Sequence, residues 1–275
     1  MACDHSCANC SSKENCGEVQ DLRFPMNEQS QIRHVVAVVS GKGGVGKSTV
    51  TGLLALATAK AGYKTGILDA DITGPSIPRL FGVEGPLSAT DQGMLPVKSK
   101  GGVGIISANL LLPHGDDPVI WRGPLIAGVV KDFWSGTIWG DLDYLFVDMP
   151  PGTGDVPLTV FQSLPVDGCV VVTSPQQLVG MIVGKAVHMA GKMSIPILGL
   201  VENLAYYRCP SCGEELEIFG QSQVKEVANR YGLEKTLRLP IDPDLTKLSD
   251  SGRLEEYTGD TSALLALLSP LQKQE

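Results

Sequence analysis

The chain has 275 residues, of which 43% are hydrophobic and 19% charged, and its formal net charge is −8. This length suits one large α/β domain or two small ones, and the acidic balance argues against a general nucleic-acid-binding surface, which needs clustered Lys and Arg. No apolar run approaches the roughly 20 residues of a membrane-spanning helix, and the polar start is unlike a signal peptide. We therefore expect a cytoplasmic protein that binds neither nucleic acid nor membrane.

Two regions are predicted from the chain order. Residues 1–30 are polar and cysteine-rich without helical or strand periodicity, and we interpret them as a metal-binding N-terminal tail. Residues 31–275 are interpreted as one domain in which apolar strands alternate with helices. The predicted strands are Val35–Ser40, Thr65–Asp69, Gly104–Ala108, Tyr144–Asp148, Gly168–Thr173, Ile197–Glu202 and Thr236–Leu239. The predicted helices are Ser48–Ala61, Pro124–Trp134, Leu158–Ser163, Leu178–Met193, Gln223–Tyr231, Pro243–Ser249 and Ser262–Leu268.

This alternation predicts an α/β fold with a doubly wound, mostly parallel sheet, because nearly continuous apolar strands suit a sheet that is covered on both faces. Ligands of such sheets bind at the carboxyl ends of the strands. Residues 93–108 are expected to depart from the parallel pattern and form an antiparallel segment.

The first predicted strand leads into a glycine-rich turn that opens a helix. The turn consists of Gly41, Lys42, Gly43, Gly44, Val45, Gly46, Lys47, Ser48 and Thr49. Glycines let backbone N–H groups converge on phosphate oxygens at the helix start, while Lys47 would contact the β and γ phosphates and Ser48 would ligate Mg²⁺. The pattern predicts nucleotide binding. The additional lysine, Lys42, is poorly placed to reach its own nucleotide but could reach a second subunit across the two-fold axis of a dimer; the alternative is a solvated loop residue.

Acidic residues follow two other predicted strands. Asp148 ends an apolar strand, where a carboxylate can hold Mg²⁺ beside the phosphate loop. The glycine-punctuated residues 149–155 after it are expected to sense the γ phosphate, and Asp155 either transmits that state to a partner subunit or caps the next helix. Asp69 ends the second strand and Asp71 follows it; both are expected to face the phosphate and metal region, unless they only cap a turn.

Seven cysteines are spread unevenly along the chain. Cys169 lies within an apolar run and is predicted to be buried without a function. Cys209 and Cys212, in Cys-Pro-Ser-Cys, can share one metal centre but supply only half of a four-ligand site. The open alternatives for this pair are a cluster bridged between two subunits, a zinc ion held the same way, and a redox dithiol.

The tail offers a second set of four thiols, Cys3, Cys7, Cys10 and Cys16. Four thiols can complete a metal site within one subunit, and the alternatives here are an iron–sulfur cluster, zinc or spare thiols. His5 is a weaker substitute for Cys3.

In this order the motifs resemble those of the deviant P-loop ATPases, the superfamily of MinD and ParA, and within it the Mrp/ApbC-like iron–sulfur cluster carriers. The resemblance covers residues 33–270. Its motifs are the phosphate loop with its extra lysine, GPSIPRLFG (Gly74–Gly82), a WRGP-like segment (Trp121–Pro124), DMPPGTGD (Asp148–Asp155), Glu202-Asn203 and Cys-Pro-Ser-Cys. The tail spacings Cys7-x2-Cys10-x5-Cys16 match one branch of this family, whereas the interval after Cys3 is shorter.

The resemblance implies roles for several residues. A homodimer would sandwich two ATP molecules, with Lys42 contacting the partner's nucleotide. Asp71 would position the attacking water, with Asp69 supporting Mg²⁺ or the loop. Asn203 and the loop around Pro240 would hold the adenine.

The function that the resemblance implies is an ATP-dependent carrier with slow ATP hydrolysis. Cys209 and Cys212 of two subunits would bridge a labile 4Fe-4S cluster, which is transferred to apo iron–sulfur proteins. Two alternatives are a MinD- or ParA-like positioning ATPase that binds DNA or membrane, and an ATP-gated electron-transfer protein similar to the nitrogenase iron protein.

Overall fold

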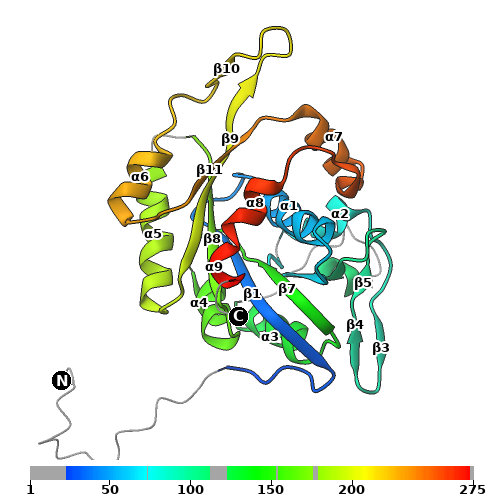
Figure 1. The fold of residues 1–275 in the computed structure, drawn as a ribbon. Coiled ribbons are helices and arrows are strands. Elements are labelled where there is room, and N and C mark those ends of the chain that lie inside the picture. The colour runs from blue at the N-terminus through cyan, green and yellow to red at the C-terminus, as the bar shows by residue number, and fades with distance from the viewer. Residues whose placement is uncertain (1–22, 73, 112–122, 153, 176–178, 273–275) are drawn as a thin grey trace, which may run out of the picture.

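A mostly parallel sheet with helices on both faces forms the body of the protein (Figure 1). A computed structural model describes residues 23–72, 74–111, 123–152, 154–175 and 179–272. In these residues the sheet order is β10-β9-β8-β1-β7-β2-β6-β5, with β11 also paired to β9. The strands are β1 Ser30–Ser40, β2 Thr65–Asp69, β3 Ser88–Thr90, β4 Gly93–Leu95, β5 Val97–Lys98, β6 Gly104–Ile106, β7 Gly140–Asp148, β8 Gly168–Thr173, β9 Ile197–Arg208, β10 Glu215–Leu216 and β11 Thr236–Pro240.

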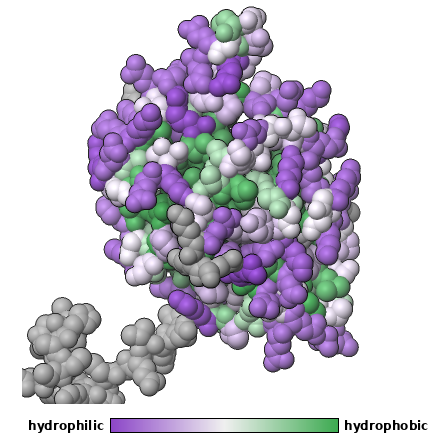
Figure 2. All heavy atoms as spheres, viewed as in Figure 1, coloured by the Kyte–Doolittle hydropathy of each residue, from purple (hydrophilic) through white to green (hydrophobic). Residues whose placement is uncertain are grey.

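The helices divide between the two faces of the sheet. They are α1 Lys47–Lys60, α2 Ile77–Phe81, α3 Gly123–Ser135, α4 Asp155–Ser163, α5 Val179–Lys192, α6 Val224–Tyr231, α7 Pro243–Asp250, α8 Ser262–Leu267 and α9 Ser269–Gln272. Helices α3 to α6 build one hydrophobic core with the sheet, and α1, α2, α8 and α9 build the other. Figure 2 shows hydrophilic residues at the periphery of one side of the molecule and hydrophobic ones gathered toward its middle.

Strand β1 explains why the apolar run near the start of the domain is continuous. Side chains alternate between the two faces of a strand, and here both faces are covered. Val35, Ala37 and Val39 belong to the core with α3 to α6. Val36 and Val38 belong to the core with α1, and all five are at most 2% exposed. The predicted doubly wound α/β sheet is therefore confirmed.

The strand order reverses at β1, which pairs in parallel with β7 on one side and β8 on the other. Chain segments after β1 build the β7, β2 and β6 side first, and β8, β9 and β11 then extend the other side. Such a reversal is where open α/β sheets bind ligands, at the carboxyl ends of the strands. The glycine-rich turn that follows β1 lies at this place.

Several element bounds differ from those predicted. Strands Thr65–Asp69 and Gly168–Thr173 have the predicted bounds. Strands β1 and β7 begin earlier than predicted, because their first residues are exposed or half-buried and so lack the continuous apolar pattern on which the prediction relied. The predicted strand Gly104–Ala108 ends at Ile106 and pairs in parallel with β2. Within residues 93–108, β5 pairs antiparallel with β6, and β4 pairs antiparallel with β3, which lies just before this region. Helix α2 and strand β10 were not predicted.

The segment before β1 lies against the body. The Phe24 N–H donates to the Ser163 carbonyl at 2.8 Å, and the Trp134 indole N–H donates to the Phe24 carbonyl at 2.9 Å. Phe24 and Met26 pack on the core that contains α3 and α4. Residues 1–22 of the predicted tail lie outside the described residues. Among the described residues, no helix is long and apolar enough to cross a bilayer.

Candidate functional site

The turn after β1 has the backbone geometry of a phosphate loop. Gly44 and Gly46 have φ of 80° and 79°, a region that glycine enters without steric cost. A Cβ on Gly46 would lie 2.2 Å from the Asn203 side-chain nitrogen, and one on Gly41 would lie 2.4 Å from Ile182. Helix α1 begins at Lys47 without a side-chain cap. Its first N–H groups are therefore available to an anion.

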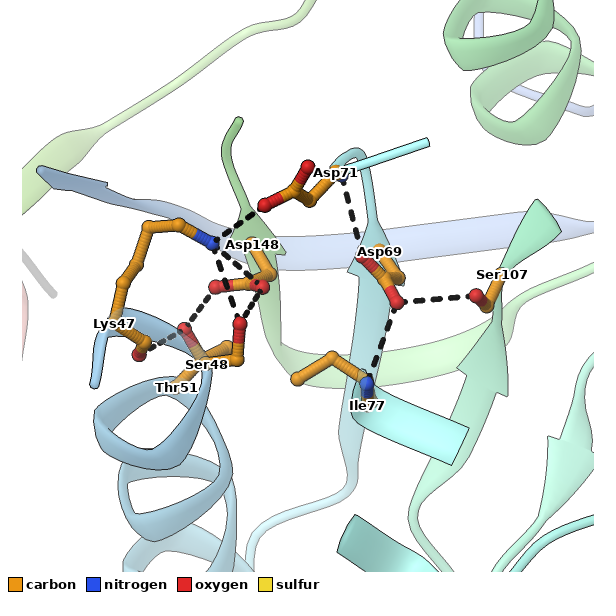
Figure 3. A network of polar contacts seen from close by, with 8 residues as sticks. All are labelled: Lys47, Ser48, Thr51, Asp69, Asp71, Ile77, Ser107 and Asp148. Carbon is orange, nitrogen blue, oxygen red and sulfur yellow. Dashed lines mark hydrogen bonds and ion pairs between the residues drawn. The ribbon is translucent and has the colours of Figure 1, made fainter. Parts of the chain in front are cut away.

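The side chains at the start of α1 converge on one carboxylate (Figure 3). The Lys47 ammonium lies 2.8 Å from Asp148 Oδ2 and 3.7 Å from Asp71 Oδ2. The Ser48 hydroxyl donates to Asp148 Oδ2 and the Thr51 hydroxyl to Asp148 Oδ1, both at 2.6 Å. Asp148 is fully buried and Lys47 is 6% exposed. The structure thus brings together four side chains that sequence reasoning had placed in one site or near it.

Thr51 was missed by sequence reasoning. It lies three residues after Ser48, and residues at that spacing share one face of a helix. A threonine in a helix does not by itself indicate a site, because its hydroxyl can bond to a carbonyl of its own helix, and the Thr51 hydroxyl also donates to the Lys47 carbonyl at 3.1 Å. Only the position of Asp148 relative to α1 reveals its contact with Thr51.

Asp69 has different neighbours from Asp71. Asp69 Oδ1 accepts from the Asp71 N–H at 3.2 Å, and Oδ2 accepts from the Ser107 hydroxyl at 3.0 Å and the Ile77 N–H at 3.4 Å (Figure 3). Burial, followed by the charge of Asp148, raises the pKa of Asp69 to about 8. Its carboxyl group joins the end of β2, the start of α2 and the residue after β6. These contacts are those of a residue that supports the loop carrying Asp71.

The other residues predicted for the nucleotide site surround the same loop. Asn203 is 6% exposed, and its side-chain N–H donates to the Val45 carbonyl at 3.0 Å. Pro240 ends β11 and pairs with Tyr206 of β9. Lys42 and Gly43 are exposed, and Thr49 is half-buried in the first turn of α1. Asn203 therefore lies against the phosphate loop, and Lys42 is an exposed residue of that loop.

Beyond Asn203, strand β9 runs past the sheet and forms a hairpin with β10 that projects from the body (Figure 1). Cys209 and Cys212 lie in its turn. The Cys209 N–H donates to the Glu214 carbonyl at 2.9 Å, and the Gly213 N–H donates back to the Cys209 carbonyl at 2.8 Å. This turn closes with Gly213 at φ 76°. Strand β9 ends at Arg208, six residues beyond the predicted end at Glu202.

The hairpin turn favours a thiolate. The backbone N–H groups of Cys212 and Ser211 lower the pKa of Cys209, with a contribution from the Cys212 side chain. Cys209 is half-buried and Cys212 exposed. Within the described part of the chain, no three His, Cys, Asp or Glu side chains gather as a metal site. One copy of the chain offers two thiols in this turn, which is half of a four-ligand site.

Several predicted residues are placed elsewhere or lie outside the described residues. Cys169 is fully buried in β8, and burial raises the pKa of its thiol to about 12, which confirms the prediction of a core residue. The tail cysteines at positions 3, 7, 10 and 16 and the residues Trp121, Arg122 and Thr153 are not described. The Asp155 backbone begins α4, but its side chain is likewise outside the described part.

A doubly wound sheet with this loop and its lysine defines a P-loop NTPase. The chain belongs to the family described as "ParA: NUBPL iron-transfer P-loop NTPase", whose model matches residues 31–271. The fold and the family predicted from the sequence motifs are both confirmed.

Relatives with similar sequences extend over nearly the whole chain. The "Iron-sulfur cluster carrier protein" of Clostridium perfringens is 45% identical over 271 residues, which cover 93% of this chain and 95% of the relative. The protein of the same name from Methanocaldococcus jannaschii is 43% identical, with 91% of this chain and 89% of the relative covered.

Solved structures agree with this assignment. A nucleotide-binding protein from Archaeoglobus fulgidus in complex with ADP is 48% identical, with a TM-score of 0.76, and covers 84% of this chain and 91% of that one. The Aquifex aeolicus cell-division protein MinD in complex with MinC has a TM-score of 0.59 at 20% identity, with 88% of this chain and 96% of that one covered. The second likeness shows the fold alone, so it gives no support to a positioning function.

Proposed function

We propose that the chain is an ATP-dependent iron–sulfur cluster carrier, which hydrolyses ATP slowly and transfers a labile 4Fe-4S cluster to apo iron–sulfur proteins. One observation carries the proposal: strand β9 bears both Asn203, which contacts the phosphate loop, and the Cys209/Cys212 turn. The names of the relatives and the ADP complex of the Archaeoglobus fulgidus protein support the two ligands. We place the protein in the cytoplasm, where clustered thiols stay reduced.

The nucleotide would bind around the loop of residues 41–49. Backbone N–H groups of the loop and the Lys47 ammonium would hold the phosphates, while Asn203 and Pro240 would flank the adenine. The oxygens of Ser48 and Asp148 lie 2.6 Å apart and are hard ligands that fit Mg²⁺. These two residues would hold the ion, which would supply charge neutralisation for the phosphates.

Hydrolysis requires groups that act on the γ phosphate and on water. Lys47 is held by Asp148 and Asp71, so a triphosphate would compete with two carboxylates for its charge. Asp71 would position the attacking water, and it is held for that task by its N–H bond to Asp69. Lys42 is exposed and would contact the nucleotide of a second subunit.

The cluster would bind between two copies of the chain, which are proposed to form a homodimer. Each hairpin offers two thiols, and a 4Fe-4S cluster needs four ligands. The lowered pKa of Cys209 favours the thiolate that binds iron. Cys3, Cys7, Cys10 and Cys16 are proposed to hold a second metal centre within one subunit.

Anaerobic reconstitution with iron and sulfide tests the cluster assignment. We expect absorption and Mössbauer spectra of a 4Fe-4S cluster in a dimer, with the spectrum of the bridging cluster lost in Cys209→Ala/Cys212→Ala. Cys169→Ala is the matched control, since that thiol is buried in β8. Retention of the full spectrum by the double variant, or zinc alone in protein purified without oxygen, would contradict the proposal.

A further inference from the structure

Strand β9 carries a bulge between the phosphate loop and the cysteine hairpin, and a bulged strand bends at that point. Glu202 pairs with Arg238 of β11, but the next pair is Tyr206 with Pro240, so β9 has two extra residues in this interval. Leu204, inside the interval, has φ 58°, and among the described residues only Ser194 is another non-glycine with positive φ. A left-handed leucine is strained and persists only when its surroundings hold it. Contacts around Leu204 must therefore hold β9 in this conformation where the strand leaves the sheet.

The Arg238 side chain spans this bend. Its Nη2 donates to Glu217 Oε1 at 2.6 Å, just after β10, and its Nη1 lies 4.0 Å from Glu215 Oε2. On the sheet side, Arg238 Nε lies 3.6 Å from Glu202 Oε2. The guanidinium also lies 5.2 Å from the centre of the Tyr206 ring. One planar cation thus contacts the sheet, the outgoing strand and the returning strand of the hairpin.

The ion pair between Arg238 and Glu202 is important for stability because Glu202 is buried. The residue is fully buried, its Oε2 accepts from the Ser222 hydroxyl, and its Oε1 has no hydrogen-bond partner among the described residues. A buried carboxylate needs a counter-charge, and Arg238 supplies it. Glu202 directly precedes Asn203, whose amide contacts the phosphate loop. A continuous path therefore joins the phosphate loop to the hairpin: Asn203 contacts Val45, its neighbour Glu202 pairs with Arg238, and Arg238 donates to Glu217.

We infer that Arg238 is a positioning residue that fixes the cysteine hairpin relative to Asn203 and so transmits the nucleotide state of the loop to Cys209 and Cys212. The inference rests on the proposed function and names the residue that couples its two sites. A two-state shift of the β9 bend, biased by nucleotide at Asn203, would change the exposure of the thiols through the guanidinium.

Glu217→Gln is the sharpest variant. It weakens the bond from Arg238 to the hairpin but leaves Glu202 with its counter-charge, so the fold is retained. Glu226→Gln is the matched control, because Glu226 forms a comparable ion pair with Arg230 at 3.0 Å on α6, remote from the hairpin contacts. Arg238→Lys keeps a positive charge beside Glu202 but lacks the guanidinium group, whose several N–H donors reach both Glu202 and Glu217.

The readout is the rate of Cys209 and Cys212 alkylation by iodoacetamide in the full, metal-free chain, with and without a non-hydrolysable ATP analogue. We expect the analogue to change the rate about fivefold or more in the wild type and in Glu226→Gln, the lower range of coupling between sites. In Glu217→Gln and Arg238→Lys this response should fall below about twofold, with unchanged analogue affinity and melting temperature.

Two results would overturn the inference: a wild type that binds the analogue without a change in thiol reactivity, and a Glu217→Gln protein that responds like the control. The assay needs no cluster. A chain that never takes up iron and sulfide but keeps the Arg238-dependent response would refute the proposed function and leave the coupling intact.

Discussion

Thr51→Val tests whether the buried carboxylate of Asp148 depends on helix α1. Valine has nearly the shape of threonine and shares its branching at Cβ, so the change removes the hydroxyl with little effect on packing or on χ1 freedom. The Thr51 hydroxyl donates to Asp148 Oδ1 at 2.6 Å, and both residues are fully buried. The same hydroxyl also lies 3.1 Å from the Lys47 carbonyl, but the shorter of the two bonds goes to a buried carboxylate that is paired with the Lys47 ammonium.

The magnitude follows from that acceptor. A hydrogen bond to a charged group contributes about 1.5–3 kcal/mol, so we expect Thr51→Val to lower the free energy of unfolding by about 2 kcal/mol. Thr58→Val is the matched control on the same helix. Thr58 is equally buried, but its partners are neutral: the Leu54 and Ala55 carbonyls and the Thr65 hydroxyl. Its loss should cost about 1 kcal/mol.

Urea unfolding at fixed pH measures both changes. A cycle with Asp148→Asn isolates the bond, because Thr51→Val should cost about 1 kcal/mol less once the acceptor is neutral. Equal losses at positions 51 and 58, or a cycle without coupling, would refute this account of how Asp148 is held.

Three further predictions concern single groups. Lys47→Ala should lower ATP hydrolysis about 100-fold or more, measured as phosphate release, because the charge that meets the phosphates is lost. Cys169 should stay unmodified by iodoacetamide in the native protein while the hairpin cysteines react, since burial raises its pKa to about 12; peptide mass spectrometry checks this. Glu202→Gln should flatten the pH dependence of stability. Burial raises the pKa of the Glu202 carboxyl above its ordinary value. In the pH window just above that ordinary value, the native state therefore keeps a proton that the unfolded state has lost, and stability falls as pH rises through this window. Urea midpoints between pH 5 and 7 that shift equally in both proteins would contradict it.

The phosphate loop and the parallel sheet could be predicted because their signals are local. Glycines at fixed spacing before Lys47 and continuous apolar strands carry their meaning within a few residues. Asp148 could be placed beside the loop for the same reason, since the carboxyl ends of parallel strands meet at one edge. The Cys-Pro-Ser-Cys pair was found by its spacing.

The hairpin and its anchor could not be predicted, because they depend on register. Glu215 and Leu216 form too short a strand to leave a period in the sequence. The pairing of Arg238 with Glu202 follows from the alignment of β11 on β9, and the strained Leu204 lies in the interval where β9 has two extra residues. Such contacts join residues whose types alone do not identify a partner.

Cluster transfer from reconstituted protein to an apo acceptor, measured with and without ATP, tests the central claim most directly. We expect ATP to change the transfer rate of the wild type, because Cys209 and Cys212 are joined through β9 to the loop that would hold the nucleotide. Lys47→Ala should transfer at one rate under both conditions. Equal rates with and without ATP in the wild type, together with unchanged transfer by Lys47→Ala, would contradict the account.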